Sequence, residues 1–347
     1  MKRIKIGKRW VGDGEPVFII AEIGGNHQGK VDLAKQMIDI AIAAKADAVK
    51  FQKRSLHRIL TKEGLNAPYN SYHSFGSTYG EHRKALELSR DDFFELKKYT
   101  KRKIILLASG WDEESVDFLD ELGVPAFKVA SADLSNWPLL EYTARKGKPV
   151  IISTGMSEMN EIEEALNIVN KYNDQVALMQ CTSTYPCEFK DVNLKVIPIL
   201  KEKFNVVVGY SGHERGIPIP VAAVAVGASI IEKHITIDRT MKGGDQAASL
   251  EPSGLTKLIR DIRHLEEAMG DGNKRLLEVE KPIRQKLAKS LVSRKAIVKN
   301  SLLKRSLLTT KGPGTGLSPK YMNDIIGKKT AKNIKKDEVI RKEDIVW

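Results

Sequence analysis

The chain has 347 residues, of which 41 % are apolar and 29 % are charged, a composition that excludes a disordered protein and allows one large domain plus a small one. No stretch approaches the ~20 consecutive apolar residues of a membrane span, and the first residues lack the apolar segment of a secretory signal, so we expect a cytoplasmic protein that does not enter the membrane. The formal net charge of +13 is concentrated at one end: residues 281–347 hold 18 Lys and Arg against 5 Asp and Glu, while residues 1–280 hold 39 of each sign.

Residues 1–16 are predicted to form a hairpin that turns at Gly12-Asp13-Gly14 and plugs the bottom of the fold. From residue 17 onward, short β-branched apolar runs alternate with amphipathic helical stretches, which is typical of parallel strands joined by crossover helices. The eight predicted strands are Val17–Ile23, Ala46–Phe51, Lys103–Ala108, Ala126–Val129, Pro149–Ile152, Val176–Gln180, Val206–Gly209 and Ser229–His234. The predicted helices are Val31–Ala44, Asp91–Lys101, Asp112–Leu122, Glu158–Lys171, Leu194–Lys203 and Ser253–Met269. Eight such units favour an α/β fold closed into a (β/α)₈ TIM barrel over an open doubly wound sheet.

One insertion and one appended module depart from this repeat. His57–Leu88 is rich in Ser, Tyr, His and Gly and is too long for an ordinary strand-to-helix loop, so we expect a lid or substrate loop. After residue 280 we expect a linker at 281–287 and a second, mainly β domain at 288–347, with strands at Ser290–Val298, Leu307–Thr310 and Val339–Val346. The catalytic barrel is accordingly predicted over residues 1–280.

The basic C-terminal segment can be interpreted in two ways. It could bind nucleic acid, or it could attract small anionic substrates to a neighbouring site. Because it carries no RRM, KH or zinc-finger motif, we expect no nucleic-acid partner. The two cysteines, Cys181 and Cys187, are too few and too close for a disulfide framework.

Polar residues follow the end of nearly every predicted strand, and barrel enzymes carry their chemistry at those ends. These residues are Glu22, Lys50 with Gln52, Ser109, Lys128 with Ser131, Ser153 with Thr154, Ser183 with Tyr185, Ser211 with His213, and Glu232 with His234. We therefore expect the active site to be assembled from them.

His213 and His234 end adjacent predicted strands. Two neutral imidazoles would bind a divalent ion such as Mn²⁺ or Zn²⁺ and leave coordination positions open for substrate. The alternative is that each ring only hydrogen-bonds a loop carbonyl. Glu22, at the end of the first strand, is a candidate for proton transfer or for orienting the metal's water.

Lys50 and Lys128 each end an otherwise apolar strand. Such a lysine can form a Schiff base or bind phosphate. The surrounding hydroxyls of Ser109, Ser131 and Ser153 favour phosphate or carboxylate binding, because charged and neutral donors act together on an oxyanion. Some of these serines could instead cap helices.

Six motifs in order along the chain resemble those of the sialic acid synthase family. They are Ala21-Glu22-Ile23-Gly24-Gly25-Asn26-His27, Asp47-Ala48-Val49-Lys50-Phe51-Gln52, Lys128-Val129-Ala130-Ser131, Ser153-Thr154-Gly155-Met156, Gly209-Tyr210-Ser211-Gly212-His213 and Ser249-Leu250-Glu251-Pro252. The tail, with Gly314-Thr315-Gly316-Leu317-Ser318-Pro319, resembles the antifreeze-like (SAF) domain that ends these enzymes.

The resemblance implies condensation of phosphoenolpyruvate with N-acetylmannosamine or its 6-phosphate, giving N-acetylneuraminate or its 9-phosphate, with Mn²⁺ or Mg²⁺ as cofactor. It implies that phosphoenolpyruvate is held by Lys50, Ser109, Lys128, Ser131, Ser153, Ser183, Tyr185 and Ser211. The metal would lie on His213 and His234. The sugar would contact Glu22, Gln52, Tyr185, Glu232, Asp245 and Lys311, and the catalytic set would be Glu22, Lys50, His213, His234 and Asp245. The family also implies a domain-swapped homodimer in which the tail of one subunit covers the barrel mouth of the other.

Three positions depart from the common family pattern. Gly312 stands where many microbial members carry a sugar-binding arginine, Ser183 replaces asparagine, and Gln246 replaces histidine. The segment Tyr79-Gly80-Glu81-His82-Arg83 is more similar to animal synthases, which use the 6-phosphate. A sister synthase for legionaminate or pseudaminate is the alternative enzyme, and a polyanion- or ice-binding module is the alternative without catalysis.

Overall fold

The structure is a computed structural model that describes residues 2–347. The chain divides into two compact units, Met1–Gly270 and Asp271–Trp347, which are described separately. No helix within residues 2–347 combines the length and apolar character needed to cross a bilayer.

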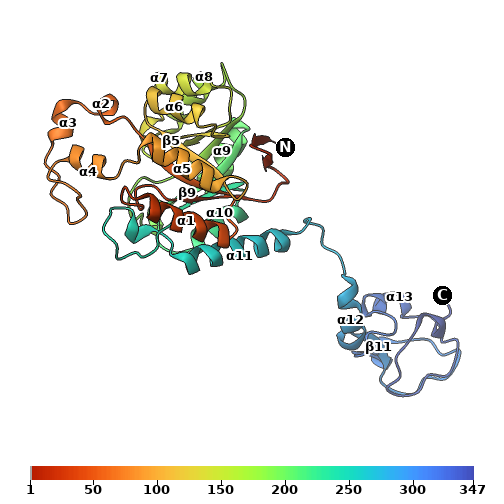
Figure 1. The fold of residues 1–347 in the computed structure, drawn as a ribbon. Coiled ribbons are helices and arrows are strands. Elements are labelled where there is room, and N and C mark those ends of the chain that lie inside the picture. Colours follow the sequence, from red (N-terminus) through yellow and green to blue (C-terminus); the bar gives the residue numbers. More distant parts are fainter. Residues whose placement is uncertain (1) are drawn as a thin grey trace. The chain divides into compact units, whose positions relative to one another are not determined.

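The first unit is a closed barrel of eight parallel strands surrounded by helices (Figure 1). The strands are β3 (Phe18–Glu22), β4 (Ala48–Lys53), β5 (Ile105–Gly110), β6 (Phe127–Val129), β7 (Val150–Ser153), β8 (Val176–Cys181), β9 (Val207–Gly212) and β10 (Ile230–His234). The longer helices are α1 (Val31–Ala43), α5 (Arg90–Thr100), α6 (Glu113–Glu121), α7 (Trp137–Ala144), α8 (Met159–Val169), α9 (Val196–Phe204), α10 (Pro218–Ala225) and α11 (Pro252–Met269). All eight predicted strands and the predicted barrel are confirmed, and β10 closes the barrel by pairing with both β3 and β9.

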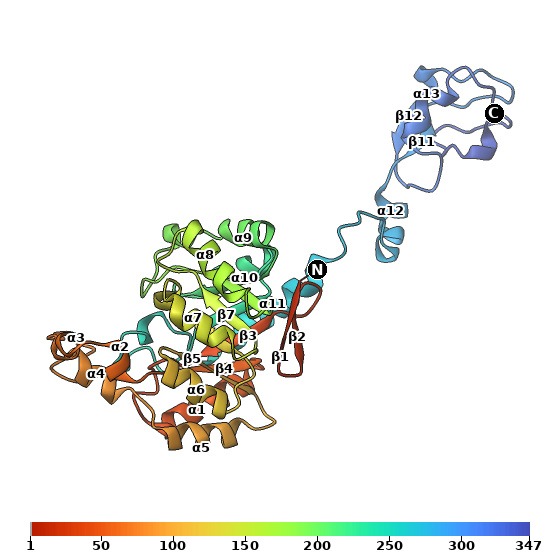
Figure 2. The same ribbon diagram turned by 90° about the horizontal axis from the view of Figure 1, so that it is seen from above.

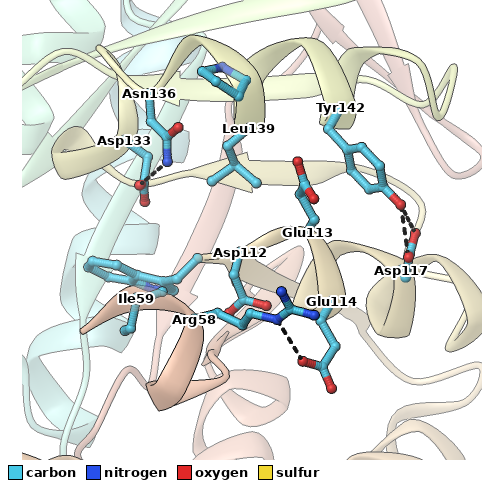
Figure 3. Close-up of a pocket in the computed structure, with 12 residues that line it drawn as sticks. Arg58, Ile59, Asp112, Glu113, Glu114, Asp117, Asp133, Asn136, Leu139 and Tyr142 are labelled. Carbon is cyan, nitrogen blue, oxygen red and sulfur yellow. Dashed lines mark hydrogen bonds and ion pairs between the residues drawn. The ribbon is translucent and has the colours of Figure 1, made fainter. Parts of the chain in front are cut away.

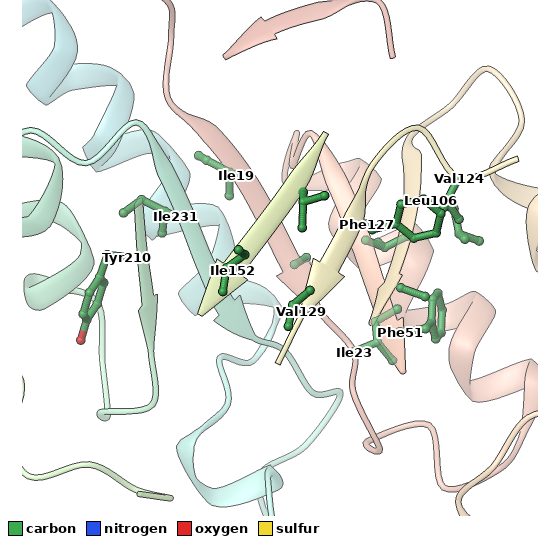
Figure 4. Close-up of a cluster of buried hydrophobic side chains, with 14 of the residues drawn as sticks. Ile19, Ile23, Phe51, Leu106, Val124, Phe127, Val129, Ile152, Tyr210 and Ile231 are labelled. Atoms are coloured by element: carbon green, nitrogen blue, oxygen red, sulfur yellow. The ribbon is translucent and has the colours of Figure 1, made fainter. Parts of the chain in front are cut away.

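Successive residues of each strand face opposite sides of the sheet, and the two sides form separate apolar clusters. Outward residues such as Ile19, Phe51 and Ile231 pack against the helices (Figure 4). Inward residues such as Phe18 and Ile20 fill the barrel interior. Each fully buried side chain of this size contributes about 1.5–3 kcal/mol relative to exposure, so register is strongly specified.

The N-terminal hairpin forms, but the predicted turn is wrong. Strands β1 (Arg3–Ile6) and β2 (Arg9–Gly12) pair antiparallel around a turn at Gly7 and Lys8. Gly7 has a φ of 62°, which suits a glycine in a tight turn. The loop at Gly12-Asp13-Gly14 instead joins the hairpin to the barrel. Ile4, Ile6 and Val11 pack on the interior cluster, as expected of a plug.

The insertion between β4 and β5 contains three short helices. They are α2 (Leu56–Ile59), α3 (Lys62–Asn66) and α4 (Tyr79–Ala85), and they project from the barrel wall in both views (Figure 1 and Figure 2). Thr78 begins α4 with a capping box, in which its hydroxyl accepts from the backbone N–H of Glu81 and the Glu81 carboxylate accepts from the backbone of Thr78. The backbone N–H of Gly243 donates to His73 Nδ1 at 3.4 Å, so the insertion contacts the loop after β10.

The second unit has its own apolar core, which includes Leu291, Ile325 and Ile340. Strands β11 (Ser290–Ser293) and β12 (Leu308–Lys311) pair antiparallel, and α13 (Met322–Ile325) packs beside them. The predicted third strand at Val339–Val346 is wrong, because only isolated bridges form there and Lys342–Asp344 makes a 3₁₀ turn.

Residues 281–287, predicted as a linker, form helix α12 (Lys281–Leu287). Pro282 lies in its first turn, where a missing N–H is tolerated. The backbone N–H of Gly314 donates to the Gln285 carbonyl at 2.7 Å, which ties this helix to the C-terminal unit. The boundary at residue 280 stays a prediction, and the compact units divide ten residues earlier.

Candidate active site

The predicted polar residues lie at the carboxyl ends of the strands and face the barrel interior, because side chains along a strand alternate between its two sides. Inward positions near the start of each strand are apolar, and the next inward positions along the same strands are polar. The buried members of this second group are Glu22, Lys50, Ser109, Lys128, Ser153, Ser211, Glu232 and His234. A polar layer therefore rests on an apolar floor inside the barrel.

Lys50 is the centre of one buried cluster. Its Nζ lies 2.8 Å from Glu22 Oε2 and 3.6 Å from Glu232 Oε1, and it donates to Ser109 Oγ at 3.3 Å. Strand pairing places Glu22 directly opposite Lys50. Ser211 Oγ donates to Glu232 Oε1 at 3.1 Å, which joins the cluster to β9.

The pKa values of the two carboxyl groups in this cluster shift in opposite directions. Burial raises the pKa of Glu22 to about 7, with Lys50 opposing and Glu232 adding to the effect. Burial also acts to raise the pKa of Glu232, but Lys128 and Lys50 outweigh it and lower that pKa to about 2. Both lysines thus favour the charged form of Glu232, which forms an ion pair with Lys50.

Lys128 is the centre of a second cluster. Its Nζ donates to Ser153 Oγ at 2.6 Å and to the Val129 carbonyl at 3.1 Å. Within residues 2–347 it forms no ion pair with a carboxylate, unlike Lys50. Burial lowers the pKa of Lys128. A buried ammonium group without an adjacent counter-ion is suited to binding an anionic ligand.

A cradle of small groups adjoins Lys128. The backbone N–H of Gly155 donates to Ser131 Oγ at 3.1 Å, and Ser131 Oγ lies 3.7 Å from Cys181 Sγ. A Cβ on Gly155 would overlap Ser183 Oγ and lie 2.8 Å from Ser131 Oγ, so a larger residue would displace both hydroxyls. Ala130, not Ser131, is the N-cap of the 3₁₀ turn Ser131–Asp133, so the Ser131 hydroxyl belongs to the cradle.

His213 and His234 lie next to one another, with ring centroids 5.5 Å apart. His213 Nδ1 lies 2.8 Å from the Thr182 carbonyl, so Nδ1 carries the proton and Nε2 keeps its lone pair. Burial, with His234 adding to it, lowers the pKa of His213 to about 4, and burial lowers the pKa of His234. Both rings are therefore neutral at physiological pH, which is the form that binds metals.

This pair fits a divalent ion held by two protein ligands. His234 Nδ1 is buried without a hydrogen-bond partner, and it lies 3.9 Å from Asp245 Oδ2. No group of three His, Cys, Asp or Glu residues within 2–347 forms a full ligand set. A metal here would take its remaining ligands from water and substrate. The hydrogen bond from His213 to the Thr182 carbonyl, which was the alternative to metal binding, is compatible with metal binding because this hydrogen bond orients the ring.

The predicted sugar-binding residues fall into two places, and Gln246 lies near one of them. Gln52 Nε2 donates to Glu22 Oε1 at 3.2 Å, and the Tyr185 ring lies 4.0 Å from the His213 ring, so both belong to the barrel mouth with Asp245. Lys311 lies in the second unit, where it pairs with Asp337. Gln246, in place of the common histidine, accepts from Thr236 Oγ1 and is buried.

Sequence reasoning missed a buried ion pair that supports the two histidines. Lys233 Nζ lies 3.0 Å from Glu214 Oε1, and the side chains are 1 % and 0 % exposed. Lys233 precedes His234 and Glu214 follows His213, so the pair joins the two histidine-bearing strands from the side opposite the site. The available signal was a charged residue directly beside each histidine, Glu214 after His213 and Lys233 before His234.

We expect Lys233→Met to lower the free energy of unfolding by about 3–5 kcal/mol, because it leaves Glu214 buried without a partner. Urea denaturation of the full chain measures this. The exposed pair of Arg3 and Glu15 is the control, and Arg3→Met should cost about 0–1 kcal/mol. A loss below 1 kcal/mol for Lys233→Met would contradict the prediction.

Two cavities lie beside the polar layer rather than within it. One of about 600 Å³ is lined by Arg58, Trp111, Asp117, Asp133 and Tyr142, among others. In Figure 3 some of its labelled acidic groups bond to neighbours, as Asp117 does to Tyr142 and Glu114 to Arg58. The second, of about 210 Å³, contains Arg54 and Arg83. None of the predicted site residues lines either one.

Comparison with known proteins agrees with this geometry. A model of the NeuB family matches residues 37–274, and a SAF domain model matches residues 288–346. The chain is 46 % identical to human N-acetylneuraminate-9-phosphate synthase over 338 residues, which is 96 % of this chain and 94 % of the human protein. It is 42 % identical to N,N'-diacetyllegionaminic acid synthase of Campylobacter jejuni, over 93 % of this chain and 98 % of that protein.

A solved structure agrees as well. The N-acetylneuraminic acid synthetase of Leptospira borgpetersenii, in complex with citrate, superposes with a TM-score of 0.71 at 38 % identity and covers 81 % of this chain and 95 % of that chain. The family match spans most of the barrel, and the human protein aligns over nearly the whole chain. This chain therefore belongs to the NeuB family of sialic acid synthases and ends in a SAF domain.

Proposed function

We propose that the protein condenses phosphoenolpyruvate with N-acetylmannosamine 6-phosphate to give N-acetylneuraminate 9-phosphate and phosphate. The observation that carries this is the pair of buried lysine clusters beside two neutral histidines, in a chain 46 % identical to the human 9-phosphate synthase. The protein is thus a phosphoenolpyruvate-dependent transferase that forms a carbon–carbon bond.

Phosphoenolpyruvate has two anionic ends, a carboxylate and a phosphate. Lys128 meets one of them with the hydroxyls of Ser131, Ser153 and Ser183, since no carboxylate within residues 2–347 forms an ion pair with it. Lys50, with Ser109 and Ser211 nearby, meets the other and is held in place by Glu22 and Glu232. Charged and neutral donors together bind an oxyanion more strongly than either alone.

His213 and His234 would hold the divalent ion, for which Mn²⁺ and Mg²⁺ are the candidates. When bound, the ion would supply Lewis-acid polarisation of the aldehyde oxygen. The Thr182 carbonyl fixes the ring of His213, and Asp245, beside His234, is positioned to contact the sugar. Tyr185 covers one face of His213 and limits water on that side.

The atoms of the reaction balance with one water. C3 of phosphoenolpyruvate bonds to the aldehyde carbon, and water adds at C2, where positive charge develops. The C2–O bond to phosphate then breaks. One proton of the water ends on the former aldehyde oxygen and the other on the leaving phosphate. Glu22, fixed by Lys50 and Gln52, is assigned to orienting the water and the sugar.

Legionaminate synthesis is the second candidate. It is favoured by the 42 % identity to the Campylobacter jejuni N,N'-diacetyllegionaminic acid synthase. The two candidates share phosphoenolpyruvate and differ only in the sugar. Residues 56–88 and the loop around Asp245, which contact each other through His73 and Gly243, are the part of the barrel mouth where that difference would arise.

An end-point assay tests the proposal directly. Phosphoenolpyruvate is incubated with Mn²⁺ and, in parallel, N-acetylmannosamine, its 6-phosphate, mannose or a 2,4-diacetamido hexose, and product masses are measured. We expect the 6-phosphate to give the product of highest yield. A product only from the diacetamido sugar would favour legionaminate synthesis, and none from any sugar would contradict condensing activity.

We further propose a homodimer in which the SAF domain of one subunit covers the barrel of the other. The support is the excess of positive charge in residues 281–347, which would draw anionic substrates toward the site. In this arrangement Lys311 would approach the sugar in place of the arginine absent at Gly312. A cytoplasmic location stays a prediction.

Deleting residues 288–347 should lower kcat/KM for the sugar about 100-fold or more while circular dichroism shows a folded barrel, because the barrel has its own core. Lys311→Met in the full chain should give a smaller loss, and Lys304→Met should give none. Undiminished turnover by the truncated chain would contradict a role for the tail in catalysis.

A further inference from the structure

Two arginines face a small cavity beside the active site, and the reaction described above gives them no task. Arg54 directly follows β4 and is 6 % exposed, while Arg83 lies on α4 in the insertion. Both line the cavity of about 210 Å³, together with Tyr79, Trp111 and Asp133. The cavity thus joins the insertion to the strand ends of the barrel.

The two guanidinium groups lack a carboxylate partner. Within residues 2–347 neither forms an ion pair. Arg54 Nη2 donates to Gln52 Oε1, and its guanidinium lies 4.7 Å from the centre of the Trp111 ring. Arg83 Nε donates to Tyr79 Oη at 2.8 Å. Each arginine is therefore oriented by an uncharged neighbour and keeps donors free.

The charges around the cavity leave it cationic. Burial lowers the pKa of Arg54 to about 10, and Arg83, which lines the same cavity, adds to the effect. Glu87 of the insertion accepts from the backbone N–H of Arg54 at 3.1 Å, and its carboxylate is already paired with Lys53 at 2.9 Å. Asp133 is the one carboxylate on the wall, and burial with the nearby Asp112 raises its pKa.

The cavity is connected to the sugar end of the site. Gln52 links Arg54 to Glu22, since its amide donates to Glu22 Oε1 at 3.2 Å and its carbonyl accepts from Arg54. Asp245 Oδ2 lies 3.9 Å from His234 Nδ1. Polar contacts therefore run from Arg54 through Gln52 to Glu22 and Lys50 at the strand ends.

We propose that Arg54 and Arg83 form a phosphate subsite that receives the terminal phosphate of the acyl amino sugar. This inference rests on the proposed function, in which the aldehyde end of the open-chain sugar lies at His213 and His234. The phosphate is at the opposite end of that chain. Two guanidinium forks match a phosphate dianion in charge and in donor geometry, and Trp111 and Tyr79 hold the forks in place.

The test compares two unreactive probes, N-acetylmannosaminitol 6-phosphate and N-acetylmannosaminitol, whose aldehyde has been reduced. Their dissociation constants are measured by calorimetry on the Mn²⁺-loaded full chain and on Arg83→Met. We expect the variant to weaken binding of the phosphorylated probe about 10- to 100-fold and to change binding of the other probe less than about 3-fold. The KM for phosphoenolpyruvate should stay unchanged.

Two variants serve as controls. Arg58→Met removes a neighbouring arginine that pairs with Glu114 instead, and it should leave both probes unaffected. Arg54→Lys keeps the charge but loses the fork, and it should lose part of the preference for the phosphorylated probe. Circular dichroism checks that each variant is folded.

The outcomes separate the subsite from the proposed function. Equal weakening of both probes by Arg83→Met, no weakening of either, or a selective loss in Arg58→Met would each overturn the subsite. Condensation of phosphoenolpyruvate with a sugar by the wild-type chain would still stand in those cases. Failure of the wild-type chain to turn over any sugar would instead overturn the function itself.

Discussion

His213→Ala and His234→Ala are each expected to lower kcat about 100- to 10,000-fold, the range that corresponds to several kcal/mol of lost polarisation of the aldehyde. Each variant should also bind less Mn²⁺ than the wild type at equilibrium, measured by metal analysis after dialysis. Both effects follow from two neutral rings 5.5 Å apart that would be the only protein ligands.

The matched control is His264→Ala, on the exposed part of α11, which should leave kcat and metal content unchanged. The two histidine variants should lose metal without unfolding, because the apolar floor of the barrel lies below them. Normal phosphate release from phosphoenolpyruvate in either variant, at saturating metal, would show that the ion is not held there.

Lys128→Met is expected to raise the KM for phosphoenolpyruvate about 10- to 100-fold, since it removes a charged donor worth roughly 1.5–3 kcal/mol. The KM for the sugar should change little. Methionine has a similar length, and the variant breaks no ion pair, because no carboxylate within residues 2–347 forms one with Lys128. Steady-state kinetics with each substrate varied in turn measures the split.

Lys148→Met is the control for this variant. Lys148 precedes β7 and pairs with Asp120 at 2.6 Å, at the opposite end of the barrel from the serines, so both KM values should be unchanged. Lys50→Met should behave differently from Lys128→Met, because it leaves Glu22 and Glu232 without their shared cation and should also lower stability. A KM for phosphoenolpyruvate that does not change in Lys128→Met would remove this residue from the anion site.

Several residues could be assigned to the site from the sequence because strands have a two-residue period. Once Phe18 and Ile20 are buried inside the barrel, Glu22 must face the same side, and the same holds for Ala48 and Lys50. Parallel strands in a barrel end at one mouth. Polar residues at those ends are therefore neighbours even though they lie far apart in the chain.

Other contacts join residues that are far apart in the chain, and local sequence patterns do not predict such contacts. The hairpin turn at Gly7 was missed because Gly12-Asp13-Gly14 is the stronger turn motif, and pairing of Arg3 with Gly12 decided between them. Lys311 bonds to Asp337, 26 residues away in the chain. The SAF domain forms few regular strands, because its apolar residues meet from short loops.

The sequence by itself determined the barrel, the lysine and serine ring, and the histidine pair, since each follows from periodicity along single strands. Only the tertiary structure decided that Lys50 is paired with Glu22 while Lys128 has no such partner, and that Lys233 and Glu214 are buried together behind the histidines. It also brought Arg83 from the insertion to Arg54. These features depend on distances between side chains from different elements, and such distances are set by packing of the whole barrel rather than by any one segment.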